Sequence, residues 1–271
     1  MIRNAFSKTQ IDRLGDRLKG GPHTESDLRL LDDYRRSFGE PYEAVIRTIR
    51  QHGKFPTGRL AKSTASIVEK LRRESIRLSQ MQDIAGCRVV VTDVVEQEQF
   101  VASLRTVFPG ASVIDRRDKP SYGYRAVHII AEIAGKPVEI QVRTALQHMW
   151  AEFSEKSSDV LDPAIKYGGG PSAWRSLLMG VSKVVADYEE IEETYLNAVT
   201  ANEKIAKAVA ELPEHELECR KGREIRKSLE DSARVLEEAR ATMERRRKKI
   251  ANSLNAGISF LNEKQLEGQT R

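Results

Sequence analysis

The sequence predicts an α+β fold: a mixed β-sheet of about five strands packed by helices, with helical regions before and after it. In residues 138–143, three aliphatic side chains alternate with three polar ones, which is the period of a half-buried strand. In residues 7–80 and beyond residue 144, apolar side chains instead recur at three- and four-residue steps, which is typical of amphipathic helices. The 31% of charged and 6% of aromatic residues also fit a helix-rich chain.

The first region, residues 1–56, is predicted to be helical because its apolar side chains fall on shared helix faces. These positions are Ile11, Leu14 and Leu18, then Leu28, Leu31, Tyr34 and Phe38, then Tyr42, Val45, Ile46 and Ile49. The FPTG sequence at residues 55–58 contains turn-forming residues and is expected to interrupt the helices. Another helix is expected from Ser63 through Arg73.

The strands are expected between residues 83 and 145. Alternating side chains at residues 87–91 predict the first strand, and a helix around residues 96–107 is expected to follow it. Further strands are predicted near residues 111–116, 124–133 and 138–143. Helices packed on a mixed sheet are the expected result.

The last of these strands places Glu139, Gln141 and Arg143 on one face, because successive side chains point to opposite sides of a strand. A carboxylate, an amide and a guanidinium together can hold a metal, a hydroxyl and a phosphate. An ordinary amphipathic edge strand would show the same alternation. Thr144 follows directly and forms a capping-box pattern with Gln147, so a helix is expected to begin there.

His148 begins a polar stripe on this helix, with Glu152 and Glu155 at four- and seven-residue steps. The stripe starts where the polar face of the strand ends, which makes His148 a candidate site residue. A surface histidine or a packed histidine would fit the same pattern.

The C-terminal region, residues 168–271, is predicted to form long helices. The glycine-rich sequence at residues 162–171 lacks the Lys-Ser/Thr ending of a Walker loop and follows no strand, so it is expected to be a flexible loop. Pro213 is expected to separate two helices. Leu229, Leu236, Met243 and Ile250 recur every seven residues, which predicts helix packing, either within one chain or in a homo-oligomer.

Charge, cysteine content and hydropathy indicate which ligands and which cellular compartment to expect. The formal net charge of +5 favours polyanionic ligands such as nucleotides or RNA. Cys87 and Cys219 are too few and too far apart for a disulfide framework or a cysteine-based zinc site, which favours the cytoplasm. No stretch approaches the roughly 20 apolar residues of a membrane span, so no membrane partner is expected.

Four motifs then occur in a recognisable order: GRLAKSTASIVEK, DIAGCRVV, GYRAVH, and EIQVRT followed by QHMWAE. With them, residues 57–167 resemble the synthetase domain of the RelA/SpoT family, the pyrophosphokinases that make ppGpp and pppGpp. The resemblance implies a nucleotidyltransferase-like fold and a small synthetase, with flanking regions at residues 1–56 and 168–271. It also implies a reaction that moves the β,γ-pyrophosphate of ATP to the ribose 3′-hydroxyl of GDP or GTP and releases AMP.

The resemblance assigns the ATP side of the site to the first two motifs. Lys62 and Lys70 are expected to neutralise phosphate charge, with Ser66 donating a hydrogen bond from the same helix face. Arg59 and Arg88 match family arginines that clasp the adenine, a role that suits planar guanidinium groups.

The same resemblance assigns the catalytic and metal-binding roles to two acids. Asp83 matches the family's magnesium ligand. Glu139 matches the other acidic residue, which is expected to share the Mg²⁺ ion and to accept the hydroxyl proton.

On the acceptor side, Tyr124 matches a family tyrosine that stacks on the acceptor base. His128, Gln141 and Arg143 resemble residues that surround the transferred phosphates, where positioning and charge provide most of the catalysis. His148 on the next helix is assigned to the same side. Each of these residues, taken singly, also has an ordinary structural explanation.

Two other functions stay open. Family synthetases often read Glu-His where this chain has Ser154 and Glu155, on the acceptor side. This departure, the basic balance and the added helices favour a toxic synthetase that pyrophosphorylates the 3′ end of tRNA and blocks translation. The other alternative is a non-enzymatic, nucleotide-sensing interaction protein, whose C-terminal helices bind an antitoxin or another protein partner.

Overall fold

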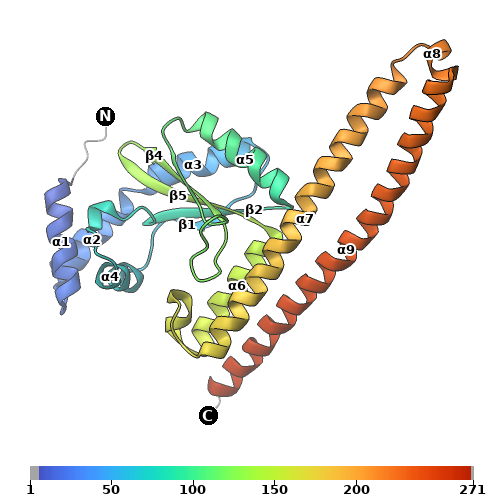
Figure 1. Ribbon diagram of the computed structural model, residues 1–271. Helices are drawn as coiled ribbons and strands as arrows, with labels where there is room; N and C mark the ends of the chain where they lie inside the picture. The colour runs from blue at the N-terminus through green and yellow to red at the C-terminus, as the bar shows by residue number, and fades with distance from the viewer. Residues whose placement is uncertain (1–5, 270–271) are drawn as a thin grey trace. The chain divides into compact units, whose positions relative to one another are not determined.

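The structure is a computed structural model that describes residues 6–269, and their side chains through residue 267. Figure 1 shows the elements in order. They are α1 (Lys8–Gly20), α2 (Glu25–Arg36), α3 (Gly39–Gln51), β1 (Thr57–Arg59), α4 (Thr64–Arg73), η1 (Leu78–Gln80), β2 (Ala85–Val91), α5 (Val94–Val107), β3 (Ser112–Asp115), β4 (Val127–Ile133), β5 (Lys136–Thr144), α6 (Ala145–Val160), η2 (Pro163–Tyr167), α7 (Ser172–Ala210), α8 (Glu214–Glu218) and α9 (Arg220–Gln269).

The strands form one mixed five-stranded sheet in the order β1-β2-β5-β4-β3, which confirms the predicted fold class. The pairs β1–β2, β3–β4 and β4–β5 are antiparallel. Strand β1 was not expected, because its three residues are exposed and follow a turn. The strand predicted from residue 124 begins only at Val127. Tyr122 and Gly123 take positive φ angles in a tight turn, in which the N–H of Tyr124 donates to the backbone oxygen of Ser121 instead of to a neighbouring strand.

Two glycines allow strands β1, β2 and β5 to approach one another closely. A Cβ atom on Gly58 would lie 2.5 Å from the backbone oxygen of Gly86, across the β1–β2 pair. A Cβ atom on Gly86 would lie 3.1 Å from the backbone oxygen of Glu139, which brings β2 against β5. Real Cβ atoms essentially never lie 2.5 Å from a backbone atom, so glycine is needed at residue 58. A distance of 3.1 Å is tighter than most real Cβ contacts, so a side chain at residue 86 would require β5 to shift by a few tenths of an ångström.

The N-terminal helices share a core with α4 and η1, as their predicted faces indicated. This core contains Ile11, Leu14, Leu18, Leu31, Tyr34, Phe38, Ile67, Val68, Leu71, Leu78, Met81, Ile84 and Ala85. Leu28, expected on the same face, is 41% exposed. The aliphatic stem of Lys136 in the β4–β5 hairpin is buried, and its ammonium lies 4.4 Å from the Tyr34 ring centroid. This cation–π contact joins the helices to the sheet.

The chain divides into two compact units that interleave along the sequence. The first unit contains the chain up to Val90, Phe100–Asp115 and Ala126–Arg143, and therefore holds the sheet. The second unit contains Val91–Gln99, Arg116–Arg125 and the chain from Thr144 onward. The division at residues 56/57 and 167/168 stays a prediction.

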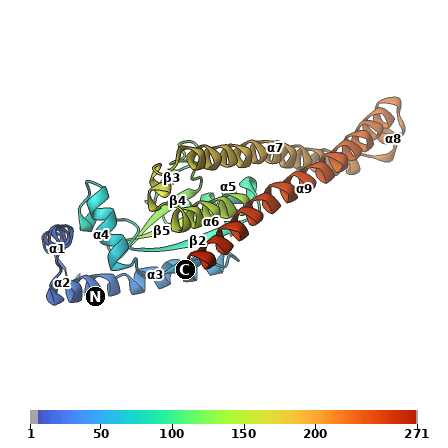
Figure 2. The same cartoon turned by 90° about the horizontal axis from the view of Figure 1, so that it is seen from below.

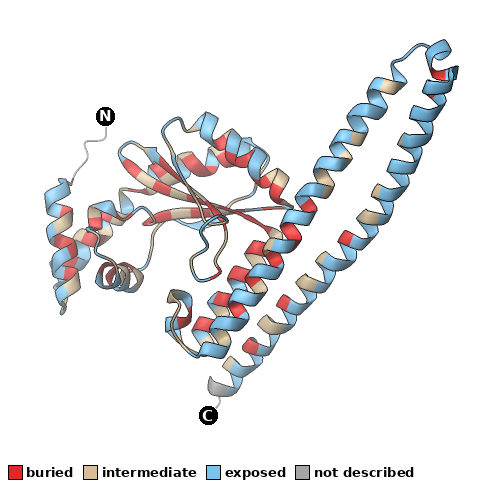
Figure 3. Ribbon diagram, viewed as in Figure 1, coloured by how far each residue is buried: buried red, intermediate tan, exposed pale blue. Residues whose placement is uncertain are grey.

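Within the second unit, α6 lies between α7 and α9 (Figure 2), and the three helices contact one another. Helix α6 begins with the predicted capping box, in which Thr144 and Gln147 satisfy each other's backbone N–H groups. Trp150 and Phe153 anchor the apolar core between these helices. The predicted break at Pro213 is also present: α7 and α9 form a hairpin joined through α8, and the far half of the hairpin is mostly exposed (Figure 3).

Two of the residues that recur every seven positions contribute to this packing within one chain: Met243 is buried and Ile250 packs beside it, whereas Leu229 and Leu236 are half-buried. The expected loop at residues 162–171 contains a short 3₁₀ helix, η2. Among the residues described, no helix is both long and apolar enough to cross a bilayer.

Candidate active site

One part of the candidate site is an acidic side chain held by two lysines. The Asp83 carboxylate lies 2.6 Å from the Lys62 ammonium and 3.0 Å from that of Lys70. Lys70 comes from α4, whereas Asp83 precedes β2. The backbone N–H of Lys62 donates to the oxygen of Ile84 over 2.7 Å, which fixes the extended segment beside this strand. The three charged groups therefore meet at one point.

Lys62 was expected on the same helix face as Ser66 and Lys70, and that detail is wrong. Ser63 is the N-cap of α4, so Lys62 lies just before the helix and reaches Asp83 from an extended segment. The Ser66 hydroxyl accepts a hydrogen bond from the Ser63 hydroxyl over 2.8 Å, within the cap. The structure brings both lysines to Asp83, with Ser66 one turn before Lys70 on α4.

The charge of Asp83 is held in place by these lysines. Burial alone would raise the pKa of the Asp83 carboxyl, but the two ammonium groups and their hydrogen bonds outweigh it, and the net pKa lies below its usual value. Asp83 is therefore ionised at neutral pH. The result is a compact cluster with two positive charges and one negative charge, which is suited to a polyphosphate ligand.

The second part of the site is a chain of hydrogen bonds across β4 and β5. His128 Nδ1 lies 2.8 Å from one oxygen of Glu139, and Gln141 donates to the other oxygen over 2.8 Å. Arg143 in turn donates to the amide oxygen of Gln141 over 2.8 Å. His128 pairs with Gln141 in the strand register, so Glu139 is its diagonal neighbour. The polar face predicted from the alternation exists.

Glu139 is also ionised at neutral pH. Burial raises the pKa of its carboxyl, but the hydrogen bonds from His128 and Gln141 together lower that pKa by more than burial raises it. The net pKa therefore lies below its usual value. The negative charge of Asp83 acts in the opposite direction and raises the pKa of Glu139. Arg143 is only 2% exposed and joins this network through its hydrogen bond to Gln141.

The arginines predicted for the ATP side share this face of the sheet. A Cβ atom on Gly86 would lie 3.4 Å from the Cβ of Glu139, so the two positions face the same way. Arg59 pairs with Gly86, and paired residues in an antiparallel ladder point to the same side. Arg88, two residues after Gly86, points there too. The face therefore combines two arginines with the Glu139 network.

Cys87 lies on the opposite face of β2 and is buried. Burial and the nearby charge of Glu139 raise the pKa of its thiol to about 12. A thiol with such a pKa is not a nucleophile at neutral pH. Cys87 is a packing residue.

The number and type of acidic side chains indicate which metal ion this site could bind. Within the described part of the chain, no three or more His, Cys, Asp or Glu side chains are grouped as a metal site. Mg²⁺, however, is commonly bound by one or two carboxylates together with substrate phosphates and water. Asp83 and Glu139 fit that pattern, whereas a zinc site would need more protein ligands.

The remaining predicted residues, Tyr124 and His148, belong to the second unit. Tyr124 lies in the loop at residues 116–125, and its ring packs against the core that contains Trp150 and Phe153. His148 lies on α6, with its Nε2 3.5 Å from Glu152, as the predicted stripe required.

Helix α7 holds the loop that carries Tyr124, which the sequence did not indicate. The Ser182 hydroxyl donates to the backbone oxygen of Gly123 over 2.6 Å, in a buried position. A Cβ atom on Gly123 would lie 2.8 Å from the Trp150 ring, and the φ angle of Gly123 is 89°. The glycine of the GYRAVH motif is therefore required by this packing.

A buried polar chain supports the same loop at its other end. Arg117 donates to Gln97 over 3.1 Å, Gln97 to Gln147 over 2.9 Å, and Gln147 to Glu189 over 3.0 Å. Thr144 also donates to Glu189. Burial raises the pKa of the Glu189 carboxyl despite these hydrogen bonds and the nearby arginines. No spacing in the sequence links these residues, which come from α5, the loop, α6 and α7.

Comparison with known proteins gives the following matches. The profile of a family described as a region found in RelA/SpoT proteins matches residues 58–158. An uncharacterized protein of Mycobacterium tuberculosis (strain ATCC 25618 / H37Rv), Rv1366, is 39% identical over 116 residues, which cover 41% of this chain and 42% of Rv1366. The chain thus matches less than half the length of this relative.

A curated relative and a solved structure from Bacillus subtilis are also similar to this chain. The GTP pyrophosphokinase YjbM of strain 168 is 34% identical over 146 residues, covering 45% of this chain and 68% of YjbM. The crystal structure of small alarmone synthetase 1, bound to its product pppGpp, aligns with a TM-score of 0.48 and 26% identity. That alignment covers 65% of this chain and 100% of the other.

Proposed function

Since this chain belongs to the RelA/SpoT family, we propose that it is a pyrophosphokinase that transfers the β,γ-pyrophosphate of ATP to the ribose 3′-hydroxyl of GDP or GTP. The similarity to the GTP pyrophosphokinase YjbM supports the reaction class. The observation that carries the proposal is the ionised Glu139, held by His128 and Gln141 on the sheet face that also carries Arg59 and Arg88.

The proposed reaction has a simple balance. The acceptor 3′-oxygen bonds to the β-phosphorus of ATP, and the bond from that phosphorus to the oxygen bridging to the α-phosphorus breaks. AMP leaves with that oxygen, and the hydroxyl proton passes to a base. Glu139 is suited to accept this proton, because its carboxylate is ionised at neutral pH and is oriented by two hydrogen bonds.

The other residues bind and orient the nucleotides. Lys62 and Lys70 would bind the ATP phosphates, and Arg59 and Arg88 would hold the adenine between planar groups. Arg143 and Gln141 would orient the transferred phosphates next to Glu139. Asp83 and Glu139 would hold Mg²⁺, which neutralises polyphosphate charge when it is bound.

On the acceptor side, Tyr124 would stack on the acceptor base, with His148 contributing from α6. The 3′ end of tRNA is the second candidate acceptor. It is favoured by the part of α6 where family synthetases often carry Glu-His: Ser154 is buried there and Glu155 is exposed. The carboxylate of the usual Glu is thus replaced by a small packed side chain.

The test is transfer from γ-labelled ATP in parallel incubations with GDP, GTP or deacylated tRNA. Label on a guanosine nucleotide supports the proposal, and label on tRNA alone assigns the second acceptor. Binding of an ATP analogue without any transfer would instead support a nucleotide-sensing interaction protein.

The matched variants are Glu139→Gln and Glu132→Gln. Glu132 is an exposed residue of the neighbouring strand β4. We expect Glu139→Gln to reduce transfer by about a hundredfold or more while the protein stays folded, because the amide cannot accept the proton. Glu132→Gln should retain full transfer. Retained transfer in Glu139→Gln would refute the assigned role of Glu139.

A further inference from the structure

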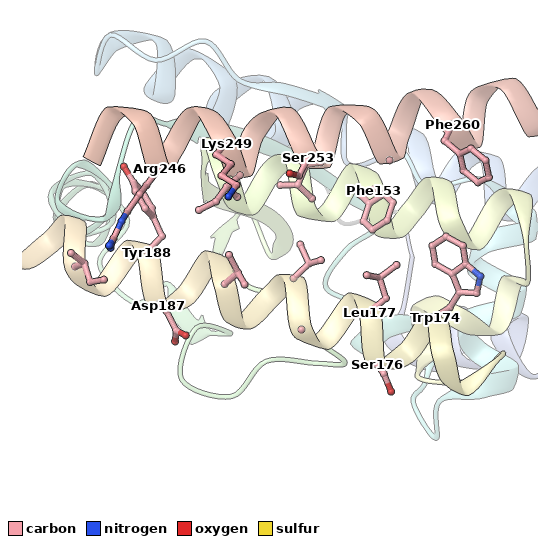
Figure 4. Close-up of a pocket in the computed structure, with 17 residues that line it drawn as sticks. Phe153, Trp174, Ser176, Leu177, Asp187, Tyr188, Arg246, Lys249, Ser253 and Phe260 are labelled. Carbon is pink, nitrogen blue, oxygen red and sulfur yellow. The ribbon is translucent and has the colours of Figure 1, made fainter. Parts of the chain in front are cut away.

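The second unit has an open apolar groove that the proposed reaction does not use. It has a volume of about 980 Å³ and lies between α7 and α9, with Phe153 of α6 in its floor. Figure 4 shows Tyr188 and Arg246 at one end of the groove, and Trp174 and Phe260 at the other.

The groove walls expose large apolar side chains in a regular pattern. On α7, Leu177 is 45% exposed, Val184 51% and Ile191 45%, at seven-residue steps. Phe260 on α9 is 50% exposed across from them. The α7 residues span about 21 Å, the length of roughly four helical turns. Contiguous exposed apolar side chains of this kind mark an interaction surface.

The α9 side of the groove carries positive charge without acidic partners. Arg246 and Lys249 line this side, and neither forms an ion pair with any residue that the structure describes. Arg245 and Lys248 border the adjoining hollow. Asp187, the acidic residue lining the groove, is already paired with Lys183 over 2.7 Å.

From this arrangement we propose that the groove docks an amphipathic α-helix of a protein partner. The apolar stripe of that helix would contact Leu177, Val184 and Ile191, as anchors three, four and seven residues apart do in helix-in-groove complexes. Acidic side chains along one border of the stripe would face Arg246 and Lys249. An apolar floor between the charged rim and α7 favours such a helix over a nucleic acid, whose backbone would leave the floor uncovered.

The groove lies on the helix that also holds the loop of Tyr124, so a bound partner would contact an element that supports this loop. Val184 lies on the same helix as Ser182, which holds the backbone of Gly123. A helix docked on one side of α7 would therefore contact the element that supports the Tyr124 loop on its other side.

The proposal is tested with the full chain and a display library of helical peptides of about 18 residues, about the span of the groove plus one turn. Each peptide has a constant leucine stripe, and both borders of the stripe vary. Selection on the chain should enrich acidic residues along one border. A single enriched peptide is then measured by fluorescence anisotropy against variants of the chain.

Val184→Asp should weaken binding of this peptide by about tenfold or more, because it places a charge in the apolar wall. Val235→Asp is the matched control, since Val235 is also an exposed valine of the hairpin and lies outside the groove. Gly180→Leu fills the groove from a position where an added Cβ meets no atom within 4 Å, and it should weaken binding without loss of fold.

Reversing the rim with Arg246→Glu and Lys249→Glu should shift the preference from acid-bordered to lysine-bordered peptides. The proposal is wrong if no peptides are enriched, if the borders carry no acidic bias, or if Val184→Asp and Val235→Asp behave alike. Self-association abolished by Val184→Asp would assign the groove to a second copy of the chain, and tRNA competing with the peptide would assign it to nucleic acid. None of these measurements depends on catalysis, so they stand apart from the proposed reaction.

Discussion

Ser182 on α7 donates a buried hydrogen bond of 2.6 Å to the backbone oxygen of Gly123, 59 residues earlier in the chain. Gly123 precedes Tyr124, the residue proposed to stack on the acceptor base. Helix α7 therefore supports a loop of the proposed acceptor side. The Trp150 indole completes this contact, because it packs on Gly123 and donates to the backbone oxygen of Leu178 on α7 over 3.0 Å.

Ser182→Ala should weaken this support. The buried Gly123 oxygen would lose its donor, which lowers the free energy of unfolding by about 1–3 kcal/mol. We also expect kcat/KM for the acceptor to fall by roughly tenfold through misplacement of Tyr124, while the Kd of an ATP analogue is unchanged. Urea denaturation, acceptor kinetics and analogue binding measure the three quantities. Ser176→Ala, an exposed serine of the same helix, is the control and should change none of them.

Gly123→Ala tests the same contact from the loop. The φ angle of 89° is unfavourable for alanine, and its Cβ would lie 2.8 Å from the Trp150 ring. The free energy of unfolding should fall by about 2 kcal/mol or more. Gly180→Ala provides the contrast, because Gly180 lies inside α7 with open space around it. That substitution should raise the free energy of unfolding by about 0.5–1 kcal/mol.

The free energy of unfolding of Asp83→Asn should change less between neutral and acid pH than that of wild type. The folded pKa of Asp83 lies below the unfolded value of 3.8, so its ion pairs with Lys62 and Lys70 stabilise the fold above that pH. This contribution is lost as the pH falls through the folded pKa. The unfolding free energy of wild type should therefore exceed that of Asp83→Asn by about 1–3 kcal/mol near pH 7, with the difference shrinking below about pH 4.

Urea titrations of both proteins from pH 7 down to the acid limit of folding check this prediction. Asp33→Asn is the control, since Asp33 is an exposed aspartate of α2. If the difference in unfolding free energy between wild type and Asp83→Asn stays constant over the whole pH range, the ionised carboxylate of Asp83 does not stabilise the fold.

Glu189→Gln should have the opposite pH dependence. Burial raises the folded pKa of Glu189 above the unfolded value of 4.5, so ionising it in the fold costs free energy as the pH rises from 4.5 through the folded pKa. The glutamine cannot ionise. The variant should gain stability relative to wild type as the pH rises from 4.5 to 8, which urea denaturation at several pH values measures.

The control for this series is Glu190→Gln, the next residue of α7, which is exposed. Its stability relative to wild type should stay within about 0.5 kcal/mol over the same range. If Glu189→Gln instead loses stability steadily toward pH 8, the ionised carboxylate is the form that the Thr144 and Gln147 hydrogen bonds favour.

The parts of the site set by local pattern were predictable. The two-residue period of β5 placed Glu139 and Gln141 on one face, and the capping box at Thr144 correctly started α6. Each of these two patterns involves residues only two or three positions apart. At that range, the direction of side chains along a strand and the chemistry of helix caps determine the local structure. The β2 strand and its alternation were likewise confirmed.

Other features depend on contacts between distant segments and have no local signal. Strand β1 is short and exposed, and it forms because Gly58 lets it approach β2. Lys62 keeps the four-residue spacing of a helix although the cap at Ser63 excludes it from one. Tyr124 continues the alternation of β4, but the turn at Tyr122 removes it from the strand. In each case, a cap, a turn or a long-range approach overrides the spacing.

The interleaving of the two units also affects how the protein is made. The neighbouring strands β2 and β5 are separated by α5, β3 and β4, so a nascent chain cannot close the sheet before Arg143 has left the ribosome. The segment at residues 116–125 is synthesised before β5 but waits for α7 to supply Ser182 and Glu189. A chain whose translation stops before α7 would therefore lack both contacts that hold the Tyr124 loop in the folded protein.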